Sequence, residues 1–377
     1  MLTAPLVKER ATLLGFDLCG IAPACDLDEL ARLPHWLARG FGGRMTYLNR
    51  TARVRADVRR WLSSARSVTV VANLYNTDHP HHVEMADPSR ARIARYAWGD
   101  DYHDVMKAML ERLAARLRDE AGPFEGRSYV DTGPIAEKAW AAAAGIGAWG
   151  KNGCLLHPEH GSWFFLGELV TDLDLPGDAP RADLCGTCTA CLEACPTGAL
   201  VAPYVLGATR CISYLTIEVK GSLPEGKREG LGRHVFGCDI CQDVCPFNAV
   251  APLAGDLCWQ PRAALVDARL EPLWTSDDAG LERAIDGTAL RRAGVRGLRR
   301  NLAVAIGNAG PPLTSVLDAG TVPGTMSDGT GLDDARPSVR DAMVAEHIDD
   351  ADGEVLREAT VGELLPGAFT PTDLPRP

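Results

Sequence analysis

The stretch CGTCTACLEACP, residues 185–196, decides how the middle of the chain folds. Its cysteines have the spacing C-x2-C-x2-C-x3-C-P of bacterial domains that bind two [4Fe–4S] clusters. Three thiolates two residues apart can bind three corners of one iron–sulfur cube. The fourth thiolate, followed by proline, points away from that cube towards the other one. The spacing therefore predicts two clusters with crossed ligands.

A second array, CDICQDVCP at residues 238–246, completes the set, with Cys211 in place of a missing first thiol. One cluster is expected on Cys185, Cys188, Cys191 and Cys245. The other is expected on Cys195, Cys211, Cys238 and Cys241. Four-cysteine zinc sites also use C-x2-C pairs, but zinc does not require two C-P ends. The other four cysteines are interpreted as ordinary small buried residues: Cys19, Cys25, Cys154 and Cys258.

The composition around these arrays is that of a globular protein. The chain has 377 residues, of which 46% are hydrophobic and 24% charged, which suits two or three domains and excludes wholesale disorder. No apolar run approaches the length of a membrane span. Lys8, Glu9 and Arg10 interrupt the first apolar run, which does not suit a signal peptide. We therefore expect a cytoplasmic protein without a membrane partner, whose cysteines bind metal rather than form disulfides.

The net charge of −11 at first argues against a nucleic-acid partner. However, residues 311–377 contain 13 acidic and 4 basic residues, a balance of −9. The first 310 residues then carry 35 basic and 37 acidic residues, which leaves room for local basic patches.

The first half has the pattern of mixed helices and strands. Ser67–Ala72 and Trp163–Val170 are apolar runs typical of buried strands. Asp104 is the expected N-cap of a helix over the following residues, because Val105, Met109, Leu110, Leu113 and Leu117 share one helical face. An alanine-rich helix should follow within residues 136–153, and its end carries four glycines. These glycines indicate either tight helix packing or a flat ligand resting on the backbone.

These elements predict an α+β multidomain protein. Residues 1–178 should form an α/β domain and residues 179–255 a bacterial dicluster ferredoxin-like domain. Residues 256–377 should form an α-helical HEAT-like domain, with helices in 273–308 and near Val339, a loop at 311–332 and an uncertain tail after 310.

Five segments together resemble the tRNA epoxyqueuosine reductase family, whose members depend on cobalamin. They are RYAWGDDYH (95–103), the stretch from VDTGPIAEKAW to FFLGEL (130–169), the first cysteine segment (185–218), GCDICQDVCPFN (237–248) and GLRRNLAVAIGN (297–308). The resemblance implies that the first domain binds cobalamin, the second delivers electrons to cobalt, and the third helps to bind a tRNA anticodon stem-loop. The implied reaction converts epoxyqueuosine to queuosine at wobble position 34. After residue 310 the sequence departs from the family pattern.

The resemblance also assigns site residues. Asp131, in the family's D-T-x-P motif, corresponds to the proton donor. Burial beside a corrin would raise the pKa of this carboxyl group, so that it could keep its proton near neutral pH. From the residues alone, Asp131 could instead belong to an Asx turn. His103, at a helix start, is more typical of a cap or surface residue than of a cobalt ligand. The residues implied to contact cobalamin are Arg55, Asp131, Leu155, Ser213, Cys238 and Asp239.

Basic residues near the end of the matched region are candidates for tRNA contact, although a solvated basic face has the same pattern. They are Lys220, Arg296, Arg299 and Arg300. We further expect a monomer that receives electrons from an external one-electron donor of the flavodoxin or ferredoxin type.

Three alternatives remain open from the sequence. A reductive dehalogenase also pairs cobalamin with two clusters, although its respiratory members usually carry an export signal. A dicluster ferredoxin-type electron carrier would not need the long first domain. The spacing of residues does not exclude a flavin in that domain.

Overall fold

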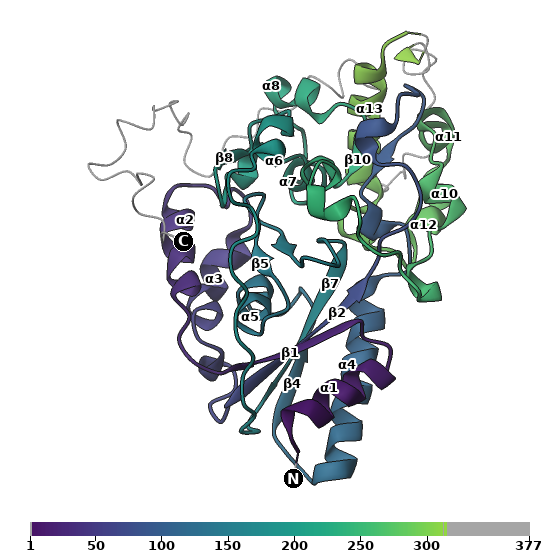
Figure 1. Ribbon diagram of the computed structural model, residues 1–377. Helices are drawn as coiled ribbons and strands as arrows, with labels where there is room; N and C mark the ends of the chain where they lie inside the picture. The colour runs from purple at the N-terminus through teal and green to yellow at the C-terminus, as the bar shows by residue number, and fades with distance from the viewer. Residues whose placement is uncertain (1, 312, 315–377) are drawn as a thin grey trace, which may run out of the picture. The chain divides into compact units, whose positions relative to one another are not determined.

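The first half of the chain is built on a four-stranded antiparallel sheet, seen near the centre of Figure 1. The computed structural model describes residues 2–311 and 313–314. The order of the strands is β1 (Leu18–Pro23), β2 (Ser67–Leu74), β7 (Phe164–Thr171) and β4 (Gly126–Tyr129). The two predicted strands are thus confirmed as β2 and β7, and every residue of both is buried. Because all pairs of this sheet are antiparallel, the α/β description holds only in the broad sense of mixed helices and strands.

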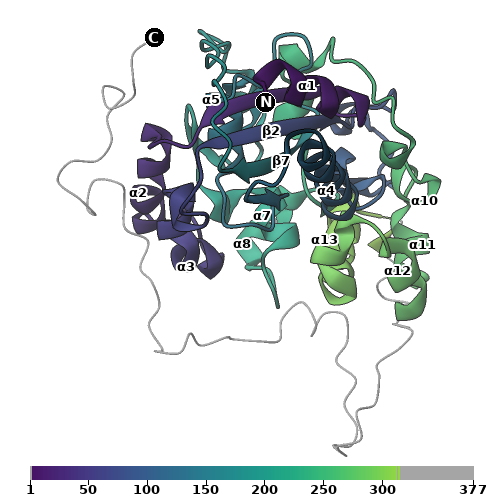
Figure 2. The same ribbon diagram turned by 90° about the horizontal axis from the view of Figure 1, so that it is seen from below.

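The two faces of the sheet carry different helices. α1 (Ala4–Leu13) and α4 (Tyr102–Ala121) cover one face, and α5 (Glu137–Ala143) packs on the other (Figures 1 and 2). Alternate residues of β7 therefore belong to different cores: Phe165 and Leu169 lie on the α4 side, Leu166 and Val170 on the α5 side.

The start of α4 differs from the prediction. Its N-cap is Asp101, whose side chain accepts from the backbone N–H of His103, and Asp104 lies in the first turn. The prediction was wrong by three residues because the helix begins before its apolar face does. The face itself is confirmed for Met109, Leu110, Leu113 and Leu117, which are buried, whereas Val105 is half-buried.

The glycines after α5 are explained at two positions by close packing of this chain. A Cβ on Gly145 would lie 2.6 Å from the carbonyl oxygen of Ala179, and one on Gly147 would lie 2.6 Å from that of Leu156. Gly145 also has a φ of +70°. Beside α5 lie β5 (Ala148–Trp149) and β6 (Leu155–Leu156), which pair with each other. α2 (Arg32–Ala38) and α3 (Thr46–Arg55) precede β2.

The cysteine-rich segment consists of short elements. They are α6 (Ala190–Ala194), β8 (Leu200–Ala202), β9 (Val205–Leu206), α7 (Ile212–Ile217), α8 (Glu225–Arg228), β10 (His234–Phe236) and α9 (Ile240–Asp243). β10 pairs in parallel with β3 (Arg92–Ile93), and α6 packs against α9. The two cysteine arrays therefore lie side by side and are joined to the first half.

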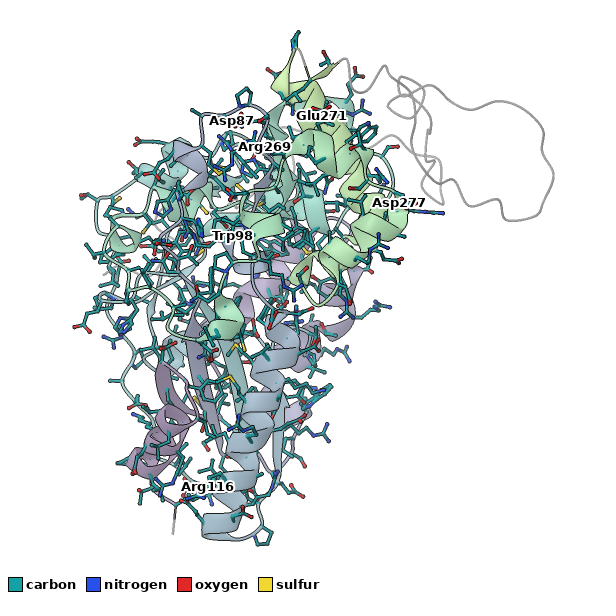
Figure 3. The ribbon with its side chains drawn as sticks, turned by 90° about the vertical axis from the view of Figure 1, so that its right-hand side faces the viewer. Asp87, Trp98, Arg116, Arg269, Glu271 and Asp277 are labelled. Atoms are coloured by element: carbon teal, nitrogen blue, oxygen red, sulfur yellow. The ribbon has the colours of Figure 1, made fainter. Side chains whose placement is uncertain are left out.

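The helices that follow are α10 (Ala263–Val266), α11 (Leu270–Thr275), α12 (Asp278–Ile285) and α13 (Gly294–Ala309). α13 packs on α7 and β10, where the buried Asn301 donates to the carbonyl oxygens of Thr216 and Val235 at 2.8 and 2.7 Å. Figure 3 shows Arg269 beside Asp87 of the first half, and their side chains form a 3.3 Å ion pair.

The helices expected in 273–308 are confirmed as parts of α11, α12 and α13. The helix expected near Val339 and most of the loop expected at 311–332 lie outside the described residues. The HEAT-like assignment and the domain boundaries near 178 and 255 remain predictions. Within the described part of the chain, no helix combines the length and the apolar character needed to cross a membrane.

Candidate active site and electron-transfer centre

The structure brings Cys245 of the second array to the first three cysteines of the first array. Cys185, Cys188, Cys191 and Cys245 line one pocket, and Cys188 is exposed. The backbone N–H of Lys151 donates to Cys185 Sγ at 3.4 Å, and the Lys151 ammonium donates to the carbonyl oxygens of Gly186 and Cys188. These bonds fix the loop that presents the thiols.

The other four cysteines of the two arrays form a second group. Burial raises the pKa of the Cys238 thiol, and the nearby thiols of Cys211 and Cys195 raise it further. A hydrogen bond with Cys154 and burial raise the pKa of Cys241, with further contributions from Cys238 and Cys211. Four thiols beside one another in each of two groups are the donor set that iron–sulfur clusters require.

Two of the remaining cysteines differ from the interpretation as ordinary buried residues. Cys25 is exposed, so that interpretation is wrong there, because the residue lies just after β1 where the chain leaves the sheet. The thiol of Cys154 is hydrogen-bonded to that of Cys241 and so adjoins the second group.

Asp131 lies in the loop that connects β4 to α5. Its φ of +49° is in the left-handed region, which few residues other than glycine adopt without strain. Its carboxylate oxygen Oδ2 accepts from the hydroxyl of Tyr102 at 2.9 Å and lies 3.2 Å from Nε2 of His103. The backbone N–H of Asp131 donates to the Glu137 carboxylate. The side chain is therefore held by α4, and the backbone by α5.

The charges in this site differ from those expected. The side chain of Asp131 is exposed, but its surroundings partly desolvate the carboxyl group and so raise its pKa; hydrogen bonds from His103 and Tyr102 outweigh this effect, so the pKa lies below its ordinary value. The raised pKa that the resemblance implies depends on burial beside a corrin and stays a prediction; in the protein alone the two donors lower the pKa. Burial lowers the pKa of His103, but hydrogen bonds to Asp101 and Asp131 outweigh it and raise the pKa to about 9.

Two further carboxyl groups lie near Asp131. Burial and the charge of Asp131 raise the pKa of Glu137 to about 8. Glu168 in β7 is fully buried, and its carboxylate oxygens have no hydrogen-bond partner among the described residues. Burial and the charges of Glu137 and Asp131 raise the pKa of Glu168 well above its ordinary value. By the alternation of β7, Glu168 lies on the α5 side of the sheet.

Arg55, implied to contact cobalamin, holds the Asp131 loop in this structure. Its guanidinium donates to the carbonyl oxygens of Gly133, at 3.0 Å, and of Ile135. Its Nε also donates to Thr51 Oγ1 in the preceding turn of α3. Arg55 therefore fastens the loop to α3.

The segment Arg95–His103 connects the second array to the Asp131 site. At its start, the backbone N–H of Arg95 donates to Asp239 Oδ2 at 2.6 Å. At its end, Tyr102 and His103 contact Asp131. Between them, the ring of Tyr96 lies 6.1 Å from that of Tyr102. Nine consecutive residues thus join the neighbour of Cys238 to the carboxylate of Asp131.

The other residues implied to contact cobalamin lie in two places. Leu155 is buried in the core on the α5 side of the sheet. Ser213 is half-buried in α7, and its hydroxyl is hydrogen-bonded to the thiol of Cys211. Asp239 is 3% exposed, and the N–H of Arg95 occupies one of its oxygens.

Of the basic candidates, Arg296 is exposed, whereas Arg299 and Arg300 bind carbonyl oxygens of their own chain. Arg299 Nη1 donates to Trp274 at 2.6 Å, and Arg300 Nη2 donates to Leu215 at 3.1 Å. Lys220 donates to the carbonyl oxygen of Arg292 at 2.9 Å. The structure thus places three of the four side chains in contacts that hold the helices together.

Sequence reasoning gave no role in this site to Asp101, Tyr102 or Glu137, and none beyond that of a cap to His103. A signal was present, since Asp101–His103 closes the segment RYAWGDDYH, which had been singled out as a unit. Nothing local, however, relates that segment to a loop some 30 residues later in the chain.

Comparison with known proteins agrees with this arrangement. A family model described as "Epoxyqueuosine reductase QueG, DUF1730" matches residues 55–132, and one for a "4Fe-4S double cluster binding domain" matches residues 184–248. An epoxyqueuosine reductase of Gloeobacter violaceus is 44% identical over 318 residues, which cover 82% of this chain and 98% of the relative. The chain belongs to the epoxyqueuosine reductase family. An epoxyqueuosine reductase of Vibrio cholerae is 40% identical over 307 residues, 80% of this chain and 82% of the relative.

Solved epoxyqueuosine reductases share the fold. One, crystallised with an epoxyqueuosine-modified stem-loop of tRNA-Tyr, has a TM-score of 0.76 and 30% identity, covering 89% of this chain and 87% of that one. Another, from Bacillus subtilis, has a TM-score of 0.75 and 29% identity over the same shares of the two chains. That structure has an aspartate catalytic loop swung out of its active site.

Proposed function

We propose that this chain reduces epoxyqueuosine to queuosine at wobble position 34 of a tRNA. Electrons from an external one-electron donor pass through two [4Fe–4S] clusters to cobalamin, and Asp131 delivers a proton. Membership of the epoxyqueuosine reductase family supports the substrate and the reaction. The alignment covers 98% of one of these relatives, so nearly all of that enzyme has a counterpart in this chain.

The observation that carries this proposal is the Arg95–His103 segment. It contacts Asp239, next to a cluster cysteine, through its first residue, and Asp131 through its last two. A redox centre and a proton donor must act on the same substrate atoms, and this segment joins the two. A ferredoxin-type electron carrier has no use for such a connection.

The two groups of thiols support the crossed assignment of the clusters. Cys185, Cys188, Cys191 and Cys245 would hold the cluster nearer the surface, since Cys188 is exposed. Cys195, Cys211, Cys238 and Cys241 would hold the cluster beside Asp239.

One observation supports binding of cobalamin on the α5 side of the sheet. The carboxylate of Glu168 and the indole N–H groups of Trp140 and Trp149 are shielded from water and have no partner among the described residues. Buried polar groups need partners, and a ligand rich in amide groups offers both donors and acceptors. Leu155 lies on this side, and Ser213, Cys238 and Asp239 would contact the cofactor from the cluster side.

When bound, the clusters supply single electrons, and cobalamin supplies a reduced cobalt ion that can open an epoxide. The chain's own residues position the acid and hold its proton. Arg55 and Glu137 fix the Asp131 loop from two directions. Tyr102 and His103 fix the carboxyl group of Asp131, which in its protonated form delivers a proton to the oxygen that leaves the epoxide.

A tRNA stem-loop is the proposed partner, because a solved relative was crystallised with one. Bases in an anticodon loop are unpaired, so presenting nucleotide 34 costs less than flipping a base from a duplex. Of the four basic candidates, Arg296 and Lys220 are exposed and are the proposed phosphate contacts. Arg299 and Arg300 would contribute only through atoms that do not bind carbonyl oxygens of the chain.

The test is anaerobic reconstitution with iron, sulfide and cobalamin, followed by reaction with a stem-loop carrying epoxyqueuosine and a chemical one-electron reductant. Mass spectrometry of the nucleosides should show queuosine. Absorption spectra before reaction should show corrin and iron–sulfur bands; flavin bands would support the flavin alternative. Intact epoxyqueuosine after reaction with fully loaded protein would refute the proposed function.

A further inference from the structure

Three side chains from two separate elements form a hydrogen-bonded row in the Asp131 site. Nδ1 of His103 lies 2.7 Å from Asp101 Oδ1, and Nε2 of the same ring lies 3.2 Å from Asp131 Oδ2. A histidine with a carboxylate at each ring nitrogen can hold a proton at both nitrogens. Asp101 is itself fixed, because it is the N-cap of α4.

We propose that Asp101, His103 and Asp131 form a proton relay, in which Asp101 orients His103 and His103 reloads Asp131 with a proton. The inference rests on the proposed function and concerns residues to which that function assigns no step. Within it, Asp131 alone meets the substrate, and Asp101 and His103 act through Asp131.

The reaction consumes more protons than one carboxyl group holds, and His103 is positioned to supply them. Reducing an epoxide to an alkene consumes two electrons and two protons and releases water. The electrons come from the external donor through the clusters, but one carboxyl group holds one proton. Asp131 starts ionised, so each proton starts on His103: its Nε2–H bond breaks, an Oδ2–H bond forms on Asp131, and Asp131 gives that proton to the substrate, the first one to the leaving oxygen. His103 then takes a proton from solvent, and Asp131 can deliver the second one.

The charges around His103 suit this role. Asp101 and Asp131 face its two nitrogens, and together they raise its pKa to about 9 against the effect of burial. Lys138 acts on Asp131, and Arg291 acts on Asp101. The ring of Tyr102 lies 4.0 Å from that of His103, and burial raises the pKa of the Tyr102 phenol well above its ordinary value. At neutral pH the imidazolium is thus the group of this row that holds a transferable proton.

Access to water completes the row. The side chain of His103 is 26% exposed and that of Asp131 is 56% exposed. His103 can therefore take up a proton from solvent and pass it to Asp131.

The first experiment compares wild type, His103→Gln and His35→Gln as reconstituted holoenzymes. His35 is an exposed histidine of α2 and serves as the matched control. We expect kcat of His103→Gln to fall about 100-fold, with KM and the cluster and corrin spectra unchanged. Wild-type kcat should decrease as pH rises through about 9, and this decrease should be absent in His103→Gln.

The second experiment tests whether the lost group is a proton carrier. Imidazole added to His103→Ala should restore part of kcat, and substituted imidazoles should restore it in proportion to their protonated fraction. A purely structural role for His103 predicts no rescue that follows protonation.

These outcomes separate the relay from the proposed function. If wild type and His35→Gln convert epoxyqueuosine and His103→Gln is equally active, the relay is overturned and the function stands. A low but unrescued kcat with an unchanged pH profile also overturns the relay. If loaded wild type converts no epoxyqueuosine, the proposed function itself fails.

Discussion

The cysteine region and the Asp131 site are assembled in opposite ways. Seven of the eight candidate cluster cysteines come from two short runs, 185–195 and 238–245, and their ligand spacing is readable from the chain. The Asp131 site instead collects side chains from the start of α4, the loop after β4, and α5. The candidate metal ligands can therefore be recognised from their spacing in the sequence. The residues of the acid site come together only when the chain folds.

The two regions also differ in what would stabilise them. Burial raises the pKa of several of these thiols, for example to about 11 at Cys245, so these neutral groups need metal to ionise. The Asp131 site is held by hydrogen bonds and charges already present in the protein. We expect variants in the first region to lose metal, and variants in the second to lose rate while keeping metal.

The largest effect is expected from removing one thiol of each array. In Cys191→Ser/Cys245→Ser, iron should fall from about eight to about four atoms per chain, because the crossed assignment puts both thiols, which line one pocket, on the same cluster. Turnover should disappear. Iron analysis and paramagnetic resonance of the reduced protein measure this, with exposed Cys25→Ser as the control. Near-complete loss of iron would mean that each array holds its own cluster, against the crossed assignment.

Asp131→Asn should reduce kcat by about 100- to 10,000-fold while iron and corrin contents stay at wild-type values, because the amide cannot donate a proton in the same way. Single-turnover reduction of the stem-loop measures this effect. Asp119→Asn, at an exposed position of α4, is the matched control. A wild-type rate in Asp131→Asn would remove Asp131 from the mechanism.

Arg55→Gln should lower kcat about 10-fold, because the loop loses its two carbonyl contacts with the guanidinium. Hydrogen exchange of residues 131–136 should become faster. Arg53→Gln, which is exposed on the same helix, should change neither quantity. If exchange in the loop stays slow while cobalamin content falls, Arg55 binds the cofactor, as the family resemblance implies.

The pH dependence of stability should distinguish the two regions. His103 has an ordinary pKa of 6.5, raised to about 9 in the fold, so its contribution to stability is fully present below pH 6.5. It is lost as pH rises through about 9. At pH 6 the Tm of wild type should exceed that of His103→Gln, by about 2–4 °C for each kcal/mol of unfolding free energy that the substitution removes. The two Tm values should converge above pH 10. A gap that widens with pH would contradict the assigned charge.

The smallest effect is expected on tRNA binding. Arg296→Ala should lower the salt dependence of stem-loop binding by about one unit of the log–log slope, because one exposed phosphate contact is lost. Arg299→Ala should instead lower Tm, since Arg299 holds the carbonyl oxygens of Trp274 and Ser276. Fluorescence anisotropy at several salt concentrations, together with thermal unfolding, measures both. An unchanged slope in Arg296→Ala would exclude it from the interface.

The sequence predicted much of the framework and less of the acid site. Strands β2 and β7 followed from apolar runs, and the face of α4 followed from its periodicity. The cap of α4 was misplaced, and the hydrogen bonds that lower the pKa of Asp131 in the protein alone were not foreseen. The cap was misplaced because α4 begins before its apolar face does. The contact of His103 with Asp131 joins residues that are distant in the chain, and periodicity carries no information about such partners.

The sequence by itself determined the dicluster cysteine motif and the buried strands, because cysteine spacing and apolar periodicity are local properties of the chain. The tertiary structure alone decided that His103 faces Asp131, that Arg55 holds the loop, and that Arg299 and Arg300 bind carbonyl oxygens. Charge and pKa depend on which groups fold to within a few ångströms of one another, and that distance is fixed only when helices and loops pack.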